Sequence, residues 1–136
     1  EMAKYYKLIR DVKKVLPISK EINRAIIETY EYLQTIPTEK GRQKHLKAVE
    51  KGLKEQYTPR MKKLSFSQGK LLIKLVDRQT HSTSYELVKA FMGPFKAGFY
   101  QTFAALFGAS LKKQYDPTGD DALTERVILM VESGQL

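Results

Sequence analysis

Apolar residues recur every three or four positions along most of this chain, which is the spacing of one face of an α-helix. Near the beginning of the chain, these positions keep almost the same angular phase on both sides of Pro17. Because a loop would scramble that phase, residues 3–35 are predicted to form one long helix kinked at the proline, or two nearly coaxial helices. The apolar face begins with Tyr5, Leu8, Ile9, Val12, Val15 and Leu16. The opposite face carries Lys4, Lys7, Arg10, Asp11, Lys13 and Lys14.

A second helix is predicted at residues 39–57, with Thr38 as its N-cap and Thr58-Pro59 as the place where it breaks or restarts. Its apolar residues form only a narrow seam, which consists of Leu46, Val49, Leu53 and Tyr57. Such a seam fits antiparallel packing against the first helix, with the rest of the surface in water.

The helix predicted at residues 66–79 is apolar around more than half of its circumference. Ser65 and Gln68 stand at the spacing of a capping box, in which each residue satisfies a backbone N–H of the other. The apolar residues are Leu71, Leu72, Ile73, Leu75 and Val76. We therefore expect this helix to be central and largely buried.

A ladder of phenylalanines follows, with four positions between one and the next. The ladder consists of Phe91, Phe95, Phe99, Phe103 and Phe107. We expect a helix at residues 95–115 whose phenylalanines, Phe99 and Phe103 above all, lie in the core. A greasy groove or a membrane-facing stripe is the alternative interpretation.

Capping and turn signals indicate two further helices. A second capping box opens a short helix over residues 83–91. Residues 116–120 have the composition of a turn, and Asp120 or Asp121 is expected to cap a last helix that ends near Glu132.

Together these elements predict an all-α fold of five or six helices. Residues 1–136 are expected to form a single domain, which is an ordinary length for one hydrophobic core. Within it, residues 1–63 would be a basic hairpin, made of the long kinked helix and its antiparallel partner. This hairpin would pack on a near-neutral helical globule formed by residues 64–136.

The formal net charge of +9 is unevenly distributed along the chain. Residues 1–63 contain 16 Lys and Arg against 8 Asp and Glu, whereas residues 64–136 contain 8 against 7. A localised basic field attracts nucleic acid, anionic lipid or acidic protein, although a well-solvated lysine-rich surface gives the same composition. No zinc-finger, ribonucleoprotein or helix-turn-helix pattern is present, so specific nucleic-acid binding is not expected and non-specific binding is a lesser alternative.

The composition also excludes several kinds of chemistry. The chain has no cysteine, which excludes disulfides, thiol nucleophiles and thiolate-bound metals. Its longest uncharged run, residues 97–111, is too short to span a membrane. No motif points to a cofactor, a metal site or a catalytic residue, and none is predicted.

Several segments of the chain resemble the domain-of-unknown-function family numbered 4294, which occurs mostly in Bacteroidetes. These segments are residues 7–15 (KLIRDVKKV), 38–44 (TEKGRQK), 64–80 (LSFSQGKLLIKLVDRQT), 84–87 (SYEL) and 115–121 (YDPTGDD), together with the phenylalanine-rich helix. The resemblance implies an exported protein, periplasmic or at the cell envelope, from which an N-terminal signal peptide has been removed. The family has no established activity, so the resemblance implies no catalytic residues.

The best site candidate is a polar arc on the helix predicted at residues 66–79. Its residues are Ser67, Gln68, Lys70, Lys74, Asp77 and Arg78. Two lysines and an arginine on one helical face could hold a carboxylate, a phosphate or an acidic peptide. In the structural alternative, the repulsion between these cations is offset by Asp77 or by an acidic residue of another helix, such as Glu86 or Asp120. The hydroxyl and the amide of the arc would then serve in capping and in buried hydrogen bonds.

These observations favour a non-enzymatic binding or interaction module, exported and acting at the cell envelope. Its basic N-terminal helices would face an anionic protein or a membrane surface. The alternative is a small hydrolase-like or metal-assisted enzyme that uses Asp77, His81 and Lys70, since the first two stand four residues apart. A pocket in which these groups converge would favour the enzyme, and a solvent-spread arc would favour the binding module.

Overall fold

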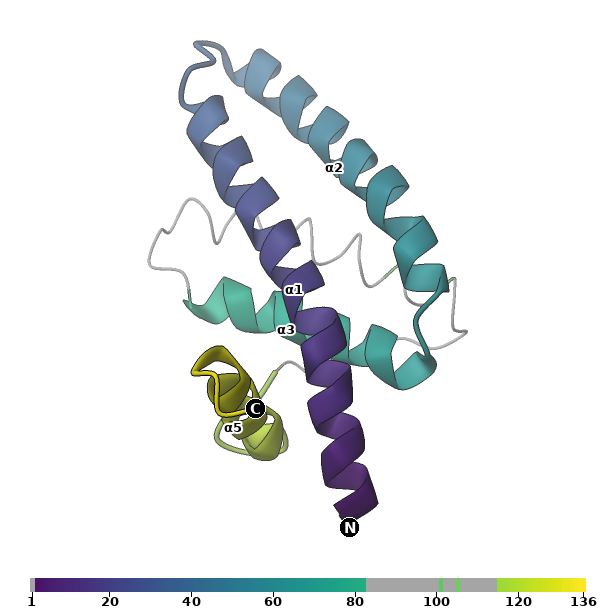
Figure 1. Ribbon diagram of the computed structural model, residues 1–136. Coiled ribbons are helices and arrows are strands. Elements are labelled where there is room, and N and C mark those ends of the chain that lie inside the picture. Colours follow the sequence, from purple (N-terminus) through teal and green to yellow (C-terminus); the bar gives the residue numbers. More distant parts are fainter. Residues whose placement is uncertain (1, 83–100, 102–104, 106–114) are drawn as a thin grey trace.

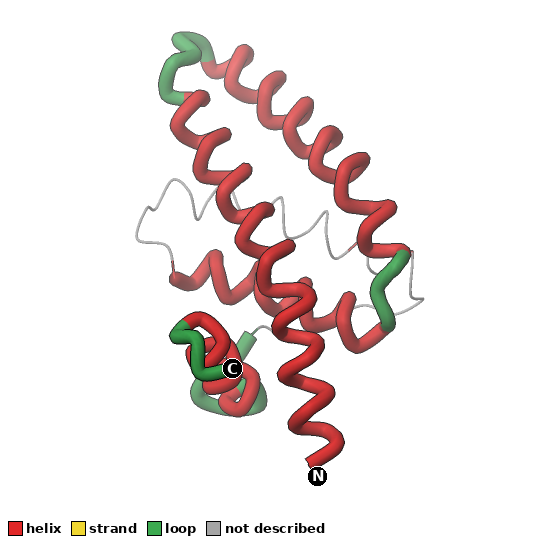
Figure 2. The backbone as a smooth tube through the Cα atoms, in the orientation of Figure 1, coloured by secondary structure: helices red, strands yellow, loops and turns green. Residues whose placement is uncertain are grey.

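The computed structural model describes residues 2–82, 101, 105 and 115–136. Figure 2 shows helices, turns and loops in this part of the chain and no strand, so the predicted all-α class is confirmed. The described helices are α1 (Met2–Leu33), α2 (Glu39–Lys62), α3 (Phe66–Ser82) and α5 (Ala122–Glu132). The described residues thus form four helices. The prediction of five or six helices was made for the whole chain.

Most of the predicted phenylalanine helix lies outside the described residues, and the same holds for the short helix expected at residues 83–91. The core positions expected for Phe99 and Phe103 lie there too. From the same predicted helix, Gln101 and Ala105 are described, and both are helical and exposed. The phenylalanine ladder as a core element therefore stays a prediction.

α1 is a single helix that continues through Pro17, as the unbroken phase of its apolar face predicts. A proline lacks the N–H that would bind the carbonyl four residues earlier, here that of Lys13, and its ring bends the helix axis. Figure 1 shows the axis of α1 changing direction near its middle. The second half of α1 runs antiparallel to α2, and the first half extends past α3 and α5 (Figure 1).

α2 begins where the sequence predicts but ends later. The side chain of Thr38 accepts a hydrogen bond from the backbone N–H of Gly41 (3.1 Å), which confirms the N-cap. The predicted break at Thr58-Pro59 is wrong, because Pro59 lies inside the helix. A proline removes only one backbone hydrogen bond. Burial of Tyr57 and Met61, which are 3% and 1% exposed, holds the last turn against the core.

The core lies where α1 crosses α3 (Figure 1). α1 packs mainly against α3, then against α5, and least against α2. The largest of the almost completely buried side chains are Val12, Val15, Ile22, Ile26, Met61, Leu72, Ile73, Leu75 and Ile128. Leu72 is 0% exposed, which confirms that α3 is a central, buried helix. This cluster contains residues from before and after position 63. The division into a hairpin and a globule therefore stays a prediction.

Local hydrogen bonds set the beginnings of α3 and α5. The capping box of α3 is confirmed, because the N–H of Gln68 donates to Ser65 Oγ (3.2 Å) and the N–H of Ser65 donates to Gln68 Oε1 (3.1 Å). The predicted turn before α5 is also present. In it, the N–H groups of Gly119 and Asp121 donate to the carbonyl of Asp116, at 3.2 and 2.9 Å.

Candidate functional site: a basic pocket between three helices

Asp11 joins α1 to the beginning of α3, and its position differs from the prediction. Its carboxylate accepts hydrogen bonds from Gln68 Nε2 (3.1 Å) and from Ser67 Oγ (3.4 Å). The residue is 5% exposed, whereas the helical pattern placed it on the face opposite the apolar one. It follows Leu8 by three positions and precedes Val15 by four, so it stands at the edge of the apolar face that α3 covers. The amide and hydroxyl of the predicted polar arc are thus engaged within the chain.

Lys74 forms an ion pair with Asp121, the residue directly before α5. Their Nζ and Oδ1 atoms are 2.6 Å apart, and the side chains are 19% and 6% exposed. The other oxygen of Asp121 accepts the backbone N–H of Asp116 (2.9 Å). Asp121 therefore stands at the N-cap as predicted, but its side chain makes no capping hydrogen bond, because both of its oxygens bind elsewhere.

Arg78 is held at two points by Glu125 of α5. The Nε–Oε1 distance is 2.8 Å and the Nη2–Oε2 distance is 2.9 Å, while a carboxylate oxygen of Glu132 lies 3.7 Å away. The hydroxyl of Tyr115 also donates to Glu125 Oε1 (2.9 Å). The hydrogen bond from Arg78 lowers the pKa of Glu125. The pKa of Tyr115 is raised mainly by burial and, second, by its hydrogen bond to Glu125. The arginine of the polar arc is thus neutralised inside the protein.

Asp77 anchors the segment that precedes α5. It is 1% exposed, and its Oδ2 atom accepts the backbone N–H of Tyr115 at 2.6 Å. It does not line the pocket that contains Lys70. The side chain of His81 lies outside the described part of the chain. The described side chains therefore do not show the convergence that would favour an enzyme.

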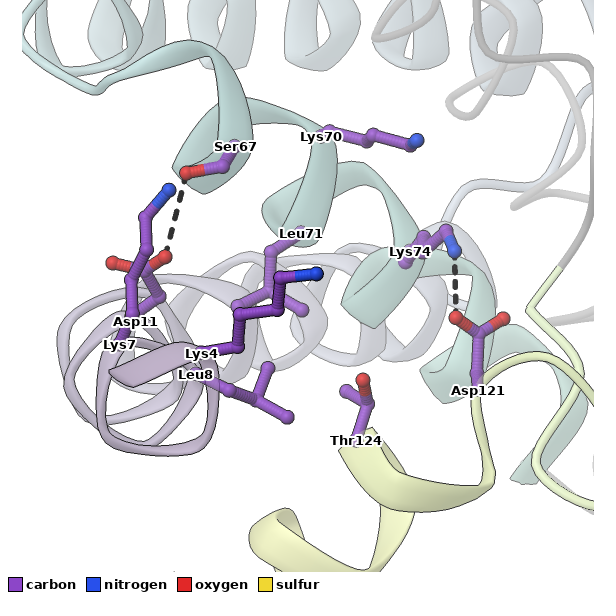
Figure 3. A pocket seen from close by; sticks show the side chains of 10 residues that line it. All are labelled: Lys4, Lys7, Leu8, Asp11, Ser67, Lys70, Leu71, Lys74, Asp121 and Thr124. Carbon is purple, nitrogen blue, oxygen red and sulfur yellow. Dashed lines mark hydrogen bonds and ion pairs between the residues drawn. The ribbon is translucent and has the colours of Figure 1, made fainter. Parts of the chain in front are cut away.

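Ser67, Lys70 and Lys74 of the polar arc line a pocket of about 240 Å³ between α1, α3 and α5 (Figure 3). The other lining residues are Lys4, Lys7, Leu8, Asp11, Leu71, Asp121 and Thr124. Figure 3 shows Lys4 and Lys7 extending from α1 toward α3. The described lining therefore includes four lysines, two aspartates, two residues with hydroxyl groups and two leucines.

The charges of this pocket are unbalanced. Asp11 and Asp121 already accept hydrogen bonds from the protein itself. Lys4, Lys7 and Lys70 form no ion pair with a carboxylate of the described residues. Ammonium groups that share one pocket repel each other, which favours the approach of an anion.

The pocket continues onto an exposed side of α1, which we call the basic face. The basic face consists of Lys4, Lys7, Arg10, Lys13 and Lys14, all of which are exposed. Within residues 2–20 the one acidic residue is Asp11, and it is buried. On α2, in contrast, exposed lysines are interspersed with exposed Glu50 and Glu55. Positive charge is thus segregated over residues 2–20 of α1 and mixed with negative charge on α2.

The sequence did not identify Lys4 and Lys7 as site residues. Their spacing defines a polar helix face, but it does not show which other helix lies beside that face. A signal was nevertheless present. Asp11 at the edge of an apolar face needs donors from another element once it is buried. The hydroxyl and amide of Ser67 and Gln68 are such donors, and this pairing brings the beginning of α3 beside the two lysines.

The fold and the pocket define an all-helical protein with a positively charged site. Over residues 1–130 the chain matches the family described as Domain of unknown function (DUF4294), and it therefore belongs to that family. Comparisons with curated proteins and with solved structures found no match.

No helix of the described residues combines the length and the apolar character needed to cross a membrane. These residues also contain no group of three or more His, Cys, Asp or Glu side chains placed to hold a metal ion.

Proposed function

We propose that this chain is a non-enzymatic binding module whose basic face holds an anionic partner. The observation that carries the proposal is the segregation of charge on α1, where the one acidic residue within residues 2–20 is turned inward. Segregated charges produce a positive field over one side of the helix, and such a field attracts extended anionic surfaces. α2 is also positive overall, with eight Lys and Arg against three Glu, but its exposed glutamates cancel part of that charge locally.

Exposed apolar side chains beside the basic face favour a membrane surface as the partner. Met2 and Tyr6 are 62% and 60% exposed, at the same end of α1 as Lys4 and Lys7. Helices that present basic residues together with aromatic or apolar ones are typical of attachment to anionic lipid. The ammonium groups would attract the headgroups, and the apolar side chains would enter the headgroup region.

The polar arc of α3 has two roles in this proposal. The residues that contribute to the anion-binding surface are Ser67, Lys70 and Lys74. The residues that support it are Gln68, Asp77 and Arg78. The supporting residues hold α1, the segment before α5, and α5 itself against α3.

The proposal places the protein at the cell envelope, periplasmic or exported, in line with the family resemblance. Fractionation of cells that express the full gene product tests this location. Recovery in the periplasmic or membrane fraction supports it, and recovery in the cytosolic fraction contradicts it.

Binding to phospholipid vesicles tests the function itself. Vesicles that contain anionic lipid should retain the protein at low salt and release it as salt rises, because the Debye length shrinks to about 10 Å at 0.1 M. The same titration with duplex DNA should show only weak, steeply salt-dependent binding. Equal retention on neutral vesicles, or no retention on anionic vesicles, would contradict the proposal.

A further inference from the structure

We infer that the pocket between α1, α3 and α5 binds a single phosphate group. The inference rests on the proposed function, because it assigns the chemistry of the anion at one point of the basic surface. The phosphate group belongs either to a soluble phosphate ester or to a lipid headgroup. Both sources present the same chemistry, which is a tetrahedral anion with several oxygen acceptors.

The charge of the pocket matches that of a phosphate monoester. Four lysines and two aspartates line it, which leaves an excess of two positive charges. The second pKa of a phosphate monoester is about 6, so the group carries close to two negative charges at neutral pH. The carboxylates of Asp11 and Asp121 are directed to donors of their own chain, which reduces their repulsion of a bound anion.

The kinds of donor in the pocket favour a tetrahedral anion over a planar carboxylate. Among the described residues that line the pocket, all four cations are lysines, and none is an arginine, whose planar fork fits a carboxylate at two points. The four lysines come from two helices, Lys4 and Lys7 from α1 and Lys70 and Lys74 from α3 (Figure 3). Thr124 adds a hydroxyl group, whereas the hydroxyl proton of Ser67 is directed to Asp11.

The size and the apolar residues of the pocket are consistent with this ligand. A volume of about 240 Å³ lies below the range of about 300–1,000 Å³ that is usual for drug-sized ligands, so a headgroup or a small ester is favoured. Leu8 and Leu71 in the lining lower the local dielectric constant, which strengthens the attraction between the ammonium groups and an anion.

A larger cavity elsewhere in the protein has a smaller charge excess, because its described lining has three cations (Lys20, Arg24 and Arg78) against two carboxylates (Glu28 and Glu132). It measures about 580 Å³, and Lys20, Arg78, Leu129 and Glu132 are among its lining residues. There Lys20 and Arg78 both lie within 4 Å of a carboxylate oxygen of Glu132, at 3.3 and 3.7 Å. The anion site is therefore assigned to the smaller pocket.

An NMR titration with inorganic phosphate tests the inference, with chloride at equal ionic strength as the reference. Saturable shifts are expected at the backbone amides of Ser67 and Lys70 with phosphate and not with chloride. Lys70→Gln should weaken binding about tenfold, because a hydrogen bond to a charged group is lost. Lys14→Gln, on the basic face but outside the pocket, should change it by less than about twofold. Equal weakening by both variants, or no saturable shift, would overturn the inference.

Vesicles separate the two sources of phosphate. At equal surface charge, headgroups of phosphatidic acid offer a phosphate monoester and those of phosphatidylglycerol a diester. Preferential retention on phosphatidic acid that Lys70→Gln abolishes assigns a lipid headgroup. A Lys70-dependent phosphate titration without this preference assigns a soluble ester, and no dependence on Lys70 in either assay overturns the inference. If Lys14→Gln leaves retention on anionic vesicles unchanged, the result counts against the basic face and not against the pocket. The two proposals therefore fail separately.

Discussion

Lys70, Lys74 and Arg78 stand on one face of α3 but have three different electrostatic environments. Arg78 is bound at two points by Glu125, and Lys74 is bound at one point by Asp121. Lys70 is exposed and pairs with no carboxylate of the described residues. Separating a paired cation from its carboxylate costs free energy, so Arg78 is the structural end of the arc. Lys70 has no such cost, and it is the end that a ligand can reach.

Replacing Arg78 by Ala is expected to lower the free energy of unfolding by about 1.5–3 kcal/mol. The substitution removes two charge-assisted hydrogen bonds and leaves Glu125 without its main cation. Thermal denaturation measures the effect, with Arg10→Ala as the matched control. Arg10 is exposed, so its replacement should stay within about 0.5 kcal/mol. An unchanged melting temperature for Arg78→Ala would contradict this account and would move the ligand site to Arg78.

The lowered pKa of Glu125 predicts a pH dependence of stability. The stabilisation from its carboxylate is fully present above the ordinary pKa of 4.5 and is lost as the pH falls through the lowered pKa of the folded state. Wild type should therefore be more stable than Glu125→Gln at neutral pH, and the difference should shrink toward about pH 3. Chemical denaturation at several pH values measures it, and a difference that stays constant with pH would refute the assignment.

At the scale of elements, the central helix supplies the most direct test of packing. Leu72 of α3 is 0% exposed, whereas Leu123 of α5 is 48% exposed. Leu72→Ala should lower the free energy of unfolding by about 2–5 kcal/mol, because it opens a cavity in the core. Leu123→Ala should change it by less than about 0.5 kcal/mol. Equal effects of the two substitutions in chemical denaturation would mean that α3 is not the centre of the core.

Elements that depend on local chemistry could be predicted from the sequence. The continuity of α1 through Pro17 followed from helical phase, and the capping box at Ser65 followed from the spacing of two polar residues. The end of α2 could not be predicted in this way. Pro59 alone indicates a break, and the burial of Met61 that carries the helix past it depends on distant residues.

The candidate site could be predicted only in part, for the same reason. The polar arc and its need for counter-charges followed from the sequence, but the identity of the partners did not. Asp121 and Glu125 each stand 47 positions from the cation that they bind, so the choice depends on how α5 lies against α3. The contribution of Lys4 likewise depends on the packing of α1 beside α3, which no local pattern reports.

At the scale of the whole molecule, the net charge of +9 is less informative than its arrangement. Lys74 and Arg78 of α3 are balanced by Asp121, directly before α5, and by Glu125 of α5. On α2 exposed lysines and glutamates share the surface, and on α1 the exposed charge is positive throughout residues 2–20. The described residues thus present a strongly positive surface on α1, which includes the pocket between α1, α3 and α5.

The most direct test of this account compares two triple variants that have the same net charge. One replaces Lys7, Arg10 and Lys14 of the basic face by Gln, and the other replaces the exposed lysines of α2. The α2 substitutions are Lys44→Gln, Lys47→Gln and Lys51→Gln. Because each variant loses three positive charges, differences between them report the position of the charge and not its total.

Retention on vesicles of anionic lipid is the measurement. At about 1 kcal/mol for each cation near the surface, the α1 variant should bind about a hundredfold more weakly than wild type. The α2 variant should keep most of its binding at the same salt concentration. Equal losses in the two variants would contradict the account, because the binding would then follow net charge and not the basic face of α1.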